Sequence, residues 1–404
     1  MASKEASSIT SIDLGDRPLE LLAALPEGDL KQRLTECQQR PPERTRFSIA
    51  HRGAPLRLPE HTRESYLAAV RQGAGLLECD VTFTKDKQLV CRHSQCDLHS
   101  TTDILTTPLA ETCRNPFMPA QFSGGKLRSP ATAKCCTSEL SLQDFKSLRG
   151  RMDNVNSRAI NVSEYLQMEE AEPVYGELLS HRESIALFDS LGVDMIPELK
   201  EPLTDMPFNG YTRQDYAEQL IQEYRDMGIA PERVWPQSFH LEDVSYWLKS
   251  APDFADQVVF LDGRYNHPGF DQRNPIDLNP DMHSLAESGV QIIAPPLWIL
   301  LALEDDQIAA SPYARAAQRA GLDIMSWTLE RSGSLTNGGG WYYQSITPAI
   351  QHEGAVFEVL HVLANEVGVL GVFSDWPATV TFYANCFNAQ SHVPDGSPAG
   401  TDGI

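Results

Sequence analysis

Histidines and carboxylates stand at the ends of several short apolar runs in this chain. His51 follows the run RFSIA, and Glu78 and Asp80 lie one residue apart within the run LLECDVTF. His93 follows a shorter apolar run, and Glu198 lies near the end of the run DMIPEL. Carboxylate oxygens are the ligands that Mg²⁺ and Ca²⁺ prefer, and imidazole exchanges protons near neutral pH. Brought together, these five residues would combine a divalent cation with general acid–base catalysis.

Strand geometry predicts how two of these carboxylates are oriented. Successive side chains of a strand point to opposite faces, so Glu78 and Asp80 share one face and Cys79 lies on the other. Burying carboxylates among apolar residues is costly unless a counter-charge is present. Each candidate also has a structural explanation without catalysis. Glu78 and Asp80 could lie on a solvated outer face, and Glu198 could simply pair with Lys200. Each histidine, taken alone, could be a core or capping residue. The coincidence of all the candidates on three successive strands favours one metal site.

Eight strand-like runs with amphipathic segments between them define the expected elements. Runs of Val, Ile, Leu and Phe indicate strands, and apolar residues at helical spacing indicate helices. The clearest predicted helices cover residues 62–72, 177–191, 213–227 and 241–250. The predicted strands cover residues 46–50, 76–83, 194–200, 234–239, 258–263, 291–297, 323–329 and 369–375. Eight strand–helix units predict a (β/α)₈ TIM barrel, whose active site lies at the carboxyl ends of the strands. A doubly wound open sheet is the alternative, but its GxGxxG loop is absent.

The predicted barrel covers residues 45–385, preceded by an N-terminal arm, residues 1–44, and followed by a flexible tail, residues 386–404. A long, Cys-rich insertion after the second strand, residues 97–175 or thereabouts, interrupts the strand–helix rhythm. Loops of that length are usually functional or disordered, and the cysteines favour order. The insertion has little apparent core of its own, and we expect it to overhang the site.

The cysteines predict both a crosslink and a compartment. A disulfide lowers the entropic cost of ordering a long loop, so we expect at least one bond between Cys113 and either Cys135 or Cys136. The eight cysteines have no CxxC spacing, which argues against a zinc site. Disulfides favour an exported protein, periplasmic or secreted. The chain start has no apolar signal segment, which keeps a cytoplasmic location as the alternative.

Charge and hydropathy narrow the range of partners. The formal net charge of -22 argues against nucleic-acid binding and against a stable anchor on an anionic membrane. The sequence contains no run of about 18 apolar residues, the length that a membrane-spanning helix needs. A small-molecule substrate is the expected partner, and the oligomeric state stays open.

The segment Ile49–Asp103 resembles the signature of glycerophosphodiester phosphodiesterases, a family of TIM barrels with phospholipase C-like chemistry. The family pattern has HRG, PENT, ExD, TKDG and a second histidine, and this chain has HRG, PEHT, ECD, TKDK and RH in the same order. Further along, the segments IPELK, QSF, WT and GVFSDWP resemble later strand ends of the family. The resemblance covers residues 46–383.

The resemblance implies roles for particular residues and hydrolysis of glycerophosphodiesters to glycerol phosphate and an alcohol such as choline, ethanolamine or glycerol. It leaves open which histidine is the acid, and whether water or a glycerol hydroxyl is the nucleophile. The implied cofactor is one divalent cation, Mg²⁺ or Ca²⁺. The implied roles are an acid/base pair, His51 and His93; metal ligands, Glu78, Asp80 and Glu198; and substrate-binding residues, Arg52, Lys200 and Trp327.

The chain also departs from the family pattern at four positions. His61 stands where the family has Asn, Lys87 where it has Gly, Ser94 where it has Asp, and His99 where it has Arg. The turn at Lys87 is therefore expected to differ, and the surroundings of the second histidine must change.

Two other functions remain as alternatives. Phospholipase D-like hydrolysis of lysophospholipids on the same barrel needs an apolar approach to the site. The insertion has few apolar residues beyond 115–122, which favours a water-soluble diester. A non-catalytic barrel that only binds phosphodiesters is the second alternative, and the presence of all five core residues argues against it.

Overall fold

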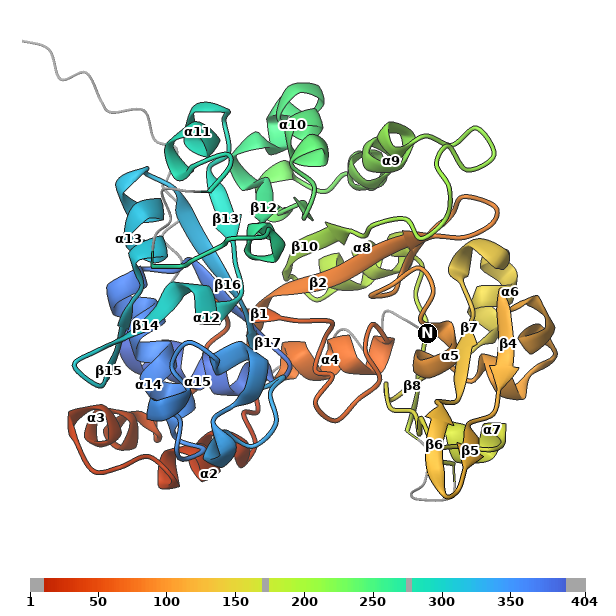
Figure 1. The fold of residues 1–404 in the computed structure, drawn as a ribbon. Helices are drawn as coiled ribbons and strands as arrows, with labels where there is room; N and C mark the ends of the chain where they lie inside the picture. Colours follow the sequence, from red (N-terminus) through yellow and green to blue (C-terminus); the bar gives the residue numbers. More distant parts are fainter. Residues whose placement is uncertain (1–10, 169–173, 274–277, 390–404) are drawn as a thin grey trace, which may run out of the picture.

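Eight parallel strands close into a barrel in the computed structural model, which describes residues 11–168, 174–273 and 278–389. The barrel closes because the first strand pairs with both the last strand and the second one (Figure 1). The predicted TIM barrel is therefore confirmed. In order around the barrel, the strands are β1 (Thr45–Ala50), β2 (Ala74–Phe83), β10 (Asp194–Leu199), β11 (Gln237–Ser238), β12 (Val259–Leu261), β13 (Ile292–Ala294), β16 (Asp323–Leu329) and β17 (Gly371–Ser374).

Helices follow the strands and cover the outside of the barrel. Side-chain caps fix several of their starts: Thr62 accepts a hydrogen bond from the Ser65 amide, and Ser180 forms a capping box with Glu183. The helix predicted over 177–191 begins only at His181, because residues 175–177 pair as a strand. The outer helices are α4 (Arg63–Arg71), α8 (His181–Ser190), α9 (Arg213–Asp226), α10 (Leu241–Ser250), α11 (Met282–Glu287), α13 (Pro312–Arg319), α14 (Ala355–Val362) and α15 (Pro377–Phe387).

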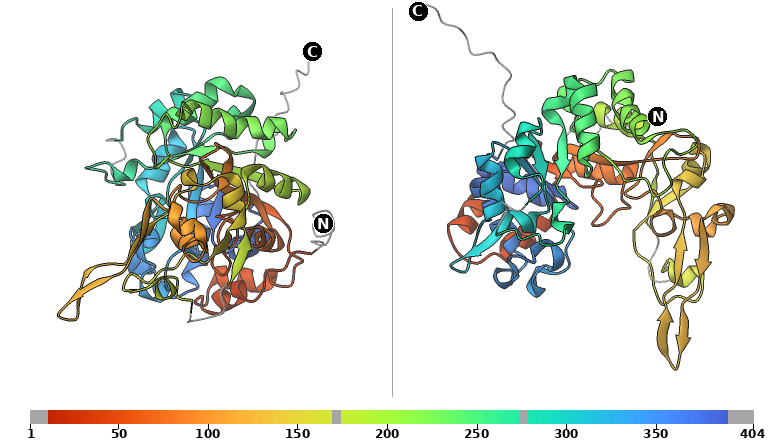
Figure 2. Two further views of the ribbon diagram at one scale, coloured as in Figure 1. Left: turned by 90° about the vertical axis from the view of Figure 1, so that its right-hand side faces the viewer. Right: turned by 45° about the horizontal axis from the view of Figure 1, so that its top comes forward.

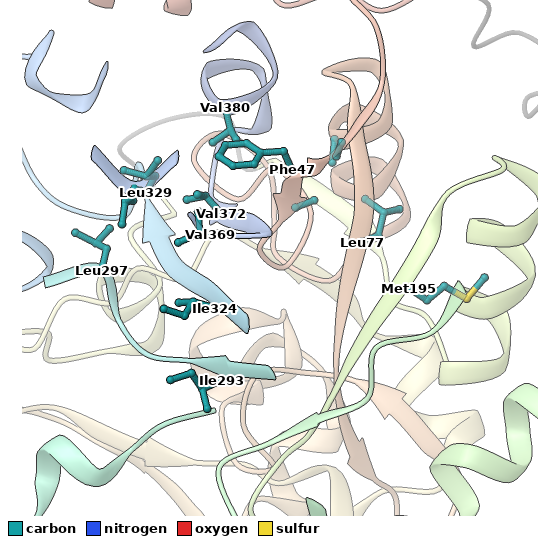
Figure 3. Packing of buried hydrophobic residues seen from close by; sticks show 14 of the residues in the cluster. Phe47, Leu77, Met195, Ile293, Leu297, Ile324, Leu329, Val369, Val372 and Val380 are labelled. Atoms are coloured by element: carbon teal, nitrogen blue, oxygen red, sulfur yellow. The ribbon is translucent and has the colours of Figure 1, made fainter. Parts of the chain in front are cut away.

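Alternate residues of the strands build two separate apolar layers. Outward-facing side chains such as Leu77, Met195 and Val372 belong to the core shared with the helices, and Figure 3 shows them with Val380 of α15. Inward-facing residues fill the barrel as a second cluster: Ile49, Leu76, Ile196, Trp235, Val259, Leu261, Ile292, Ala294, Met325 and Phe373. Because side chains alternate, residues two further along these strands face the barrel mouth.

The insertion forms a lobe beside the barrel. β2 turns back into the antiparallel strand β3 (Leu89–Cys91), and the lobe follows. Contrary to the expectation from sequence, it has its own core, which includes Leu98, Phe145 and Tyr165. Figures 1 and 2 show that its β5–β6 hairpin projects away from the barrel. Its helices and strands are α5 (Leu98–Thr101), β4 (Asn115–Met118), β5 (Gln121–Ser123), β6 (Lys126–Ser129), β7 (Thr132–Lys134), α6 (Leu142–Ser147), β8 (Arg149–Arg151), α7 (Val162–Tyr165) and β9 (Tyr175–Glu177).

All eight cysteines are joined in four disulfides. The bond Cys113–Cys135 confirms the predicted crosslink and chooses between its two possible partners. Cys96–Cys136 closes a second loop within the insertion, and Cys79–Cys91 joins β2 to β3. Cys37–Cys386 connects segments 349 residues apart in the sequence.

Part of the predicted N-terminal arm is helical and packs on the barrel. Residues 17–37 contain α2 (Arg17–Ala23) and α3 (Asp29–Cys37), which both contact α15. Leu22 and Leu34 are buried there. Arg17 pairs with Glu330, the residue after β16. Most of the predicted tail, residues 390–404, lies outside the described residues.

The remaining elements connect the later strands: α12 (Leu297–Leu300) and the hairpin of β14 (Leu301–Glu304) and β15 (Gln307–Ala310). None of the helices in the described ranges is long and apolar enough to cross a membrane.

Candidate active site

Three buried carboxylates meet at the barrel mouth. Glu78 and Asp80 come from β2 and Glu198 from its neighbour β10, with Glu198 in register beside Asp80. Each offers an oxygen, and these oxygens lie within 4.8 Å of one another. Asp80 Oδ1 is buried and has no hydrogen-bond partner among the residues that the structure describes. The strand alternation expected from sequence thus brings the three predicted metal ligands together.

The proton affinities of these carboxylates show that their charges conflict. Burial raises the pKa of Glu78 well above its ordinary value, and the charges of Asp80 and Glu198 raise it further. Burial also raises the pKa of Glu198 to about 8, although Lys200 opposes the rise. A divalent cation would remove this repulsion and would give the orphaned Asp80 oxygen a partner, so the donor set fits Mg²⁺ or Ca²⁺.

Two cationic side chains flank the carboxylates. Lys200 Nζ lies 2.6 Å from Glu198 Oε1 and 3.8 Å from Asp80 Oδ1. The Arg52 guanidinium lies 2.8 Å from Glu60 Oε2 and 3.6 Å from Asp80 Oδ2, and the Arg52 amide donates to Glu78 Oε2 at 3.0 Å. The structure therefore places both predicted phosphate-binding residues next to the carboxylate cluster.

His51 is held by a carboxylate from the last strand. Its Nδ1 donates to Asp375 Oδ1 at 2.6 Å, and its Nε2 lies 3.9 Å from Glu78 Oε2. Arg331 holds the other oxygen of Asp375 at 2.9 Å. Burial and the charge of Arg52 lower the pKa of His51 to about 4, and Asp375 opposes this shift. The Asp375 contact fixes the imidazole so that Nε2 is the nitrogen left to exchange a proton.

His93 lies at the start of the insertion lobe among other carboxylates. Nitrogen and oxygen atoms of His93, Glu60 and Asp97 lie within 4.8 Å of one another. Burial lowers the pKa of His93 well below its ordinary value, and the charges of Arg52 and Lys200 act in the same direction. Asp97 Oδ2 accepts a hydrogen bond from the Ser94 amide at 2.8 Å. Asp97 thus supplies a carboxylate near the histidine, although Ser94 has replaced the one in the family pattern.

Two other departures from the family pattern, His61 and Lys87, have left-handed backbone conformations. His61 has φ 54° and donates from Nε2 to Asp80 Oδ2 at 2.9 Å, while Tyr66 donates to its Nδ1 at 2.8 Å. Asn and His are both enriched in left-handed conformations. Lys87 has φ 61°, so the turn keeps the left-handed residue that a glycine would supply.

Several site residues were missed by the sequence reasoning. Asp375 lies in the segment GVFSDWP and Glu60 in PEHT, so the motifs contained them without assigning a role. Gln237 donates to Glu78 Oε1 at 2.9 Å, from the segment QSF. Asp97 lies outside every quoted motif position. Trp327, by contrast, was predicted as a substrate-binding residue; it stands on β16 and donates from Nε1 to the Ala294 carbonyl at 2.8 Å.

The structure is a closed (β/α)₈ barrel with histidines and acidic residues gathered at one mouth, the arrangement of a TIM-barrel enzyme, and comparison with known proteins shows its family. The profile of the Glycerophosphoryl diester phosphodiesterase family matches residues 51–379. The chain belongs to this family and is a phosphoric diester hydrolase.

Individual relatives cover the chain to different extents. An "Extracellular protein" of Arthroderma benhamiae is 42% identical over 251 residues, which are 59% of this chain and 100% of the relative. A "Probable glycerophosphodiester phosphodiesterase 1" of Mycobacterium tuberculosis is 49% identical over 49 residues, 12% of this chain and 18% of the relative. A solved structure of a putative glycerophosphoryl diester phosphodiesterase from Silicibacter pomeroyi has a TM-score of 0.55 at 16% identity and covers 89% of this chain and 98% of its own. This last similarity concerns the fold alone.

Proposed function

We propose that the protein hydrolyses glycerophosphodiesters to glycerol phosphate and an alcohol with one divalent cation, Mg²⁺ or Ca²⁺, held by Glu78, Asp80 and Glu198. The observation that carries this proposal is the cluster of three buried carboxylates with an orphaned oxygen. When bound, the cation would stabilise negative charge on the phosphate in the transition state.

The chain's own residues would supply binding and proton transfer. Arg52 and Lys200 reach the cluster from two strand ends, and each can donate to non-bridging phosphate oxygens. His51, held through Nδ1 by Asp375, would move a proton at Nε2. His93 would move the second proton, with Glu60 and Asp97 beside it. One histidine would deprotonate the nucleophile, and the other would protonate the departing alkoxide.

An assay on a panel of phosphodiesters, with chelator and metal add-back, tests the proposal. EDTA should abolish the release of glycerol phosphate, and one divalent ion should restore it. His51→Ala and His93→Ala should each keep the fold and lower kcat by about 10²–10⁴-fold. Full activity in the metal-stripped protein, or near-normal kcat in either variant, would refute the proposed mechanism.

We also propose that the protein is exported. Four disulfides are typical of oxidising compartments, and the Arthroderma relative is called extracellular. Mass spectrometry of alkylated, non-reduced protein from its native source should find the four bonds. Eight free thiols would contradict this location.

A further inference from the structure

The barrel mouth has two unlike halves. The strands β17, β1, β2 and β10 are neighbours in the sheet and carry the histidine and the carboxylates of the site. The other half of the barrel consists of β11, β12, β13 and β16. Its mouth-facing residues include Phe239 after β11 and Trp327 on β16. Gly263, after β12, is in the same half, and a Cβ there would lie 3.2 Å from the Phe239 ring. Glycine thus lets that ring lie against the end of the adjacent strand.

Aromatic rings from several segments form one connected cluster on this second half. Trp327 stacks on Trp341 with centroids 6.0 Å apart and an interplanar angle of 22°, and Phe239 meets Trp327 edge-on at 5.9 Å. Tyr342 meets Trp341 edge-on at 4.9 Å. We call the whole cluster the aromatic ledge, and its members are Phe239, Tyr265, Trp298, Trp327, Trp341 and Tyr342.

The aromatic ledge borders the proposed catalytic residues. The Asp375 amide donates to the Leu329 carbonyl at 3.0 Å, two residues beyond Trp327 on the same strand. Burial raises the pKa of Tyr342, and the nearby charges of Arg331, Arg52 and Asp375 also act on its hydroxyl. A group bound at the Trp327 end of the ledge would therefore lie near Asp375, the residue that holds His51.

Part of the ledge is open to solvent. Trp341 is 45% exposed and Phe239 37% exposed, while Trp327 is half-buried between them. Within the described ranges, no arginine or lysine is stacked on a ring of the ledge. Contiguous exposed apolar surface on a soluble protein commonly marks a binding site.

The packing of the rings favours one kind of occupant. Most rings of the ledge meet edge to face, and Trp341 contacts every other member of the ledge except Phe239, so the rings form a compact apolar cluster. A quaternary ammonium group is compact and is best bound by several ring faces around one point. In an edge-to-face pair the edge of one ring covers a face of the other, which leaves fewer faces for an ammonium group. An alkyl or acyl chain needs only exposed apolar surface, which Trp341 and Phe239 supply.

We propose that the aromatic ledge binds an apolar chain of the substrate, so that the enzyme prefers phosphodiesters with an alkyl or acyl chain over those with small polar alcohols. This inference rests on the proposed function. It reverses the preference for a water-soluble diester drawn from the sequence, because that preference considered only the insertion. The apolar approach lies on loops and strand ends 239–342, on the other half of the mouth.

Two substrate series test the inference, both kept below the critical micelle concentration. In one, the alcohol of a glycerophosphodiester lengthens from ethanol to octanol; in the other, the acyl chain of lysophosphatidylcholine lengthens. In at least one series, kcat/KM should rise with each methylene by up to about 3- to 4-fold. The series that responds identifies the side of the phosphate that carries the chain.

Matched variants assign the effect to the ledge. Trp341→Ala and Phe239→Ala should flatten the dependence on chain length while keeping the circular dichroism spectrum and hydrolysis of the shortest substrate. Phe122→Ala is the control, because Phe122 is 42% exposed but lies on the β5–β6 hairpin of the insertion. The control variant should keep the wild-type dependence.

Three results would overturn the inference. Hydrolysis of short diesters with no dependence on chain length in either series refutes the ledge and leaves the proposed function intact. A preference for glycerophosphocholine over glycerophosphoethanolamine that Trp341→Ala removes, without a chain-length effect, would make the ledge an ammonium site instead. No hydrolysis of any diester, with metal supplied, would refute the inference together with the proposed function.

Discussion

Opposing charges act on a single imidazole at the mouth of the barrel. Asp375 holds His51 through Nδ1 and raises its pKa, whereas burial and the charges of Arg52 and Arg331 lower it. The net result is a pKa of about 4 without a bound cation. Replacing either charged neighbour should therefore move the titration of this histidine in a defined direction.

Asp375→Asn and Arg331→Gln should shift the pH profile of kcat/KM in opposite directions. The first variant loses a charge that raises the pKa of His51, so the limb of the profile that belongs to His51 should move to lower pH. The second loses a charge that lowers this pKa, so the same limb should move to higher pH. Initial rates on one diester, measured from well below pH 4, which is about the pKa of His51 in the metal-free protein, up to pH 9, follow both shifts. Shifts of the same sign would contradict the assignment of that limb to His51.

His61 gives a prediction about metal affinity. It donates to Asp80 Oδ2 and leaves the orphaned Oδ1 for the proposed cation. Partners that orient metal ligands contribute about 10–100-fold in affinity. His61→Ala should lower the affinity for Mg²⁺ or Ca²⁺ in titration calorimetry by that factor. His61→Asn, the residue of the family pattern, is the matched control and should retain most of it; an unchanged affinity in His61→Ala would rule out this role.

At the scale of elements, disulfides should act differently on the barrel and on the insertion. Cys37–Cys386 joins α3 to α15 across 349 residues, whereas Cys113–Cys135 spans 22 residues of the insertion. A crosslink stabilises mainly by restricting the unfolded chain, by about 2–5 kcal/mol, and more for longer loops. The double variant Cys37→Ser/Cys386→Ser should therefore lower the Tm of the main unfolding transition by several degrees in calorimetry.

The disulfide Cys113–Cys135 of the insertion is the comparison for Cys37–Cys386. Cys113→Ser/Cys135→Ser should leave the main transition nearly unchanged, because the lobe has its own core, and should alter KM more than Tm. An equal loss of Tm in both double variants would show that the lobe and the barrel unfold as one unit.

The strands could be predicted from sequence because each is a compact apolar run, and the chemistry at their ends follows from alternation. Details that depend on single residues or on tertiary contacts could not be predicted from sequence. The run 234–239 yields only the two-residue strand β11, with a single isolated bridge from Val234 to Met195 before it. The core of the insertion also escaped prediction, since residues such as Leu98 and Tyr165 are far apart in the sequence and meet only after folding.

On the scale of the whole molecule, the site combines segments from both ends of the chain. His51 and Asp375 are 324 residues apart, and no local pattern links them. The same holds for the aromatic ledge, where Phe239 and Trp341 come from separate loops and touch a common partner, Trp327. Alternation predicted the carboxylate cluster, but the partners that orient the histidines depend on barrel closure.

Stability without metal should depend on pH through these buried groups. The pKa of His51 is about 4, below its ordinary 6.5, so the unfolded chain binds more protons between these values and stability rises with pH there. The pKa of Glu198 is about 8, above its ordinary 4.5, so the folded chain binds more protons over that range and stability falls as pH rises towards 8. The two effects oppose each other below pH 6.5, and above it Glu198 acts without opposition from His51.

The Tm of the metal-free protein should therefore fall between pH 6.5 and 8.5, and saturating Mg²⁺ or Ca²⁺ should reduce that fall. A cation favours the ionised carboxylates, so the increase in Tm on adding metal should be larger at pH 8 than at pH 6.5. Differential scanning fluorimetry in chelator and in metal, across matched buffers, measures both trends. Glu198→Gln removes one of the titrating carboxylates of the cluster and should make the metal-free fall in Tm smaller over this window. A metal-free Tm that stays constant or rises from pH 6.5 to 8.5 in the wild-type protein would show that Glu198 is already ionised, and the carboxylate cluster would then not need a cation to resolve its charges.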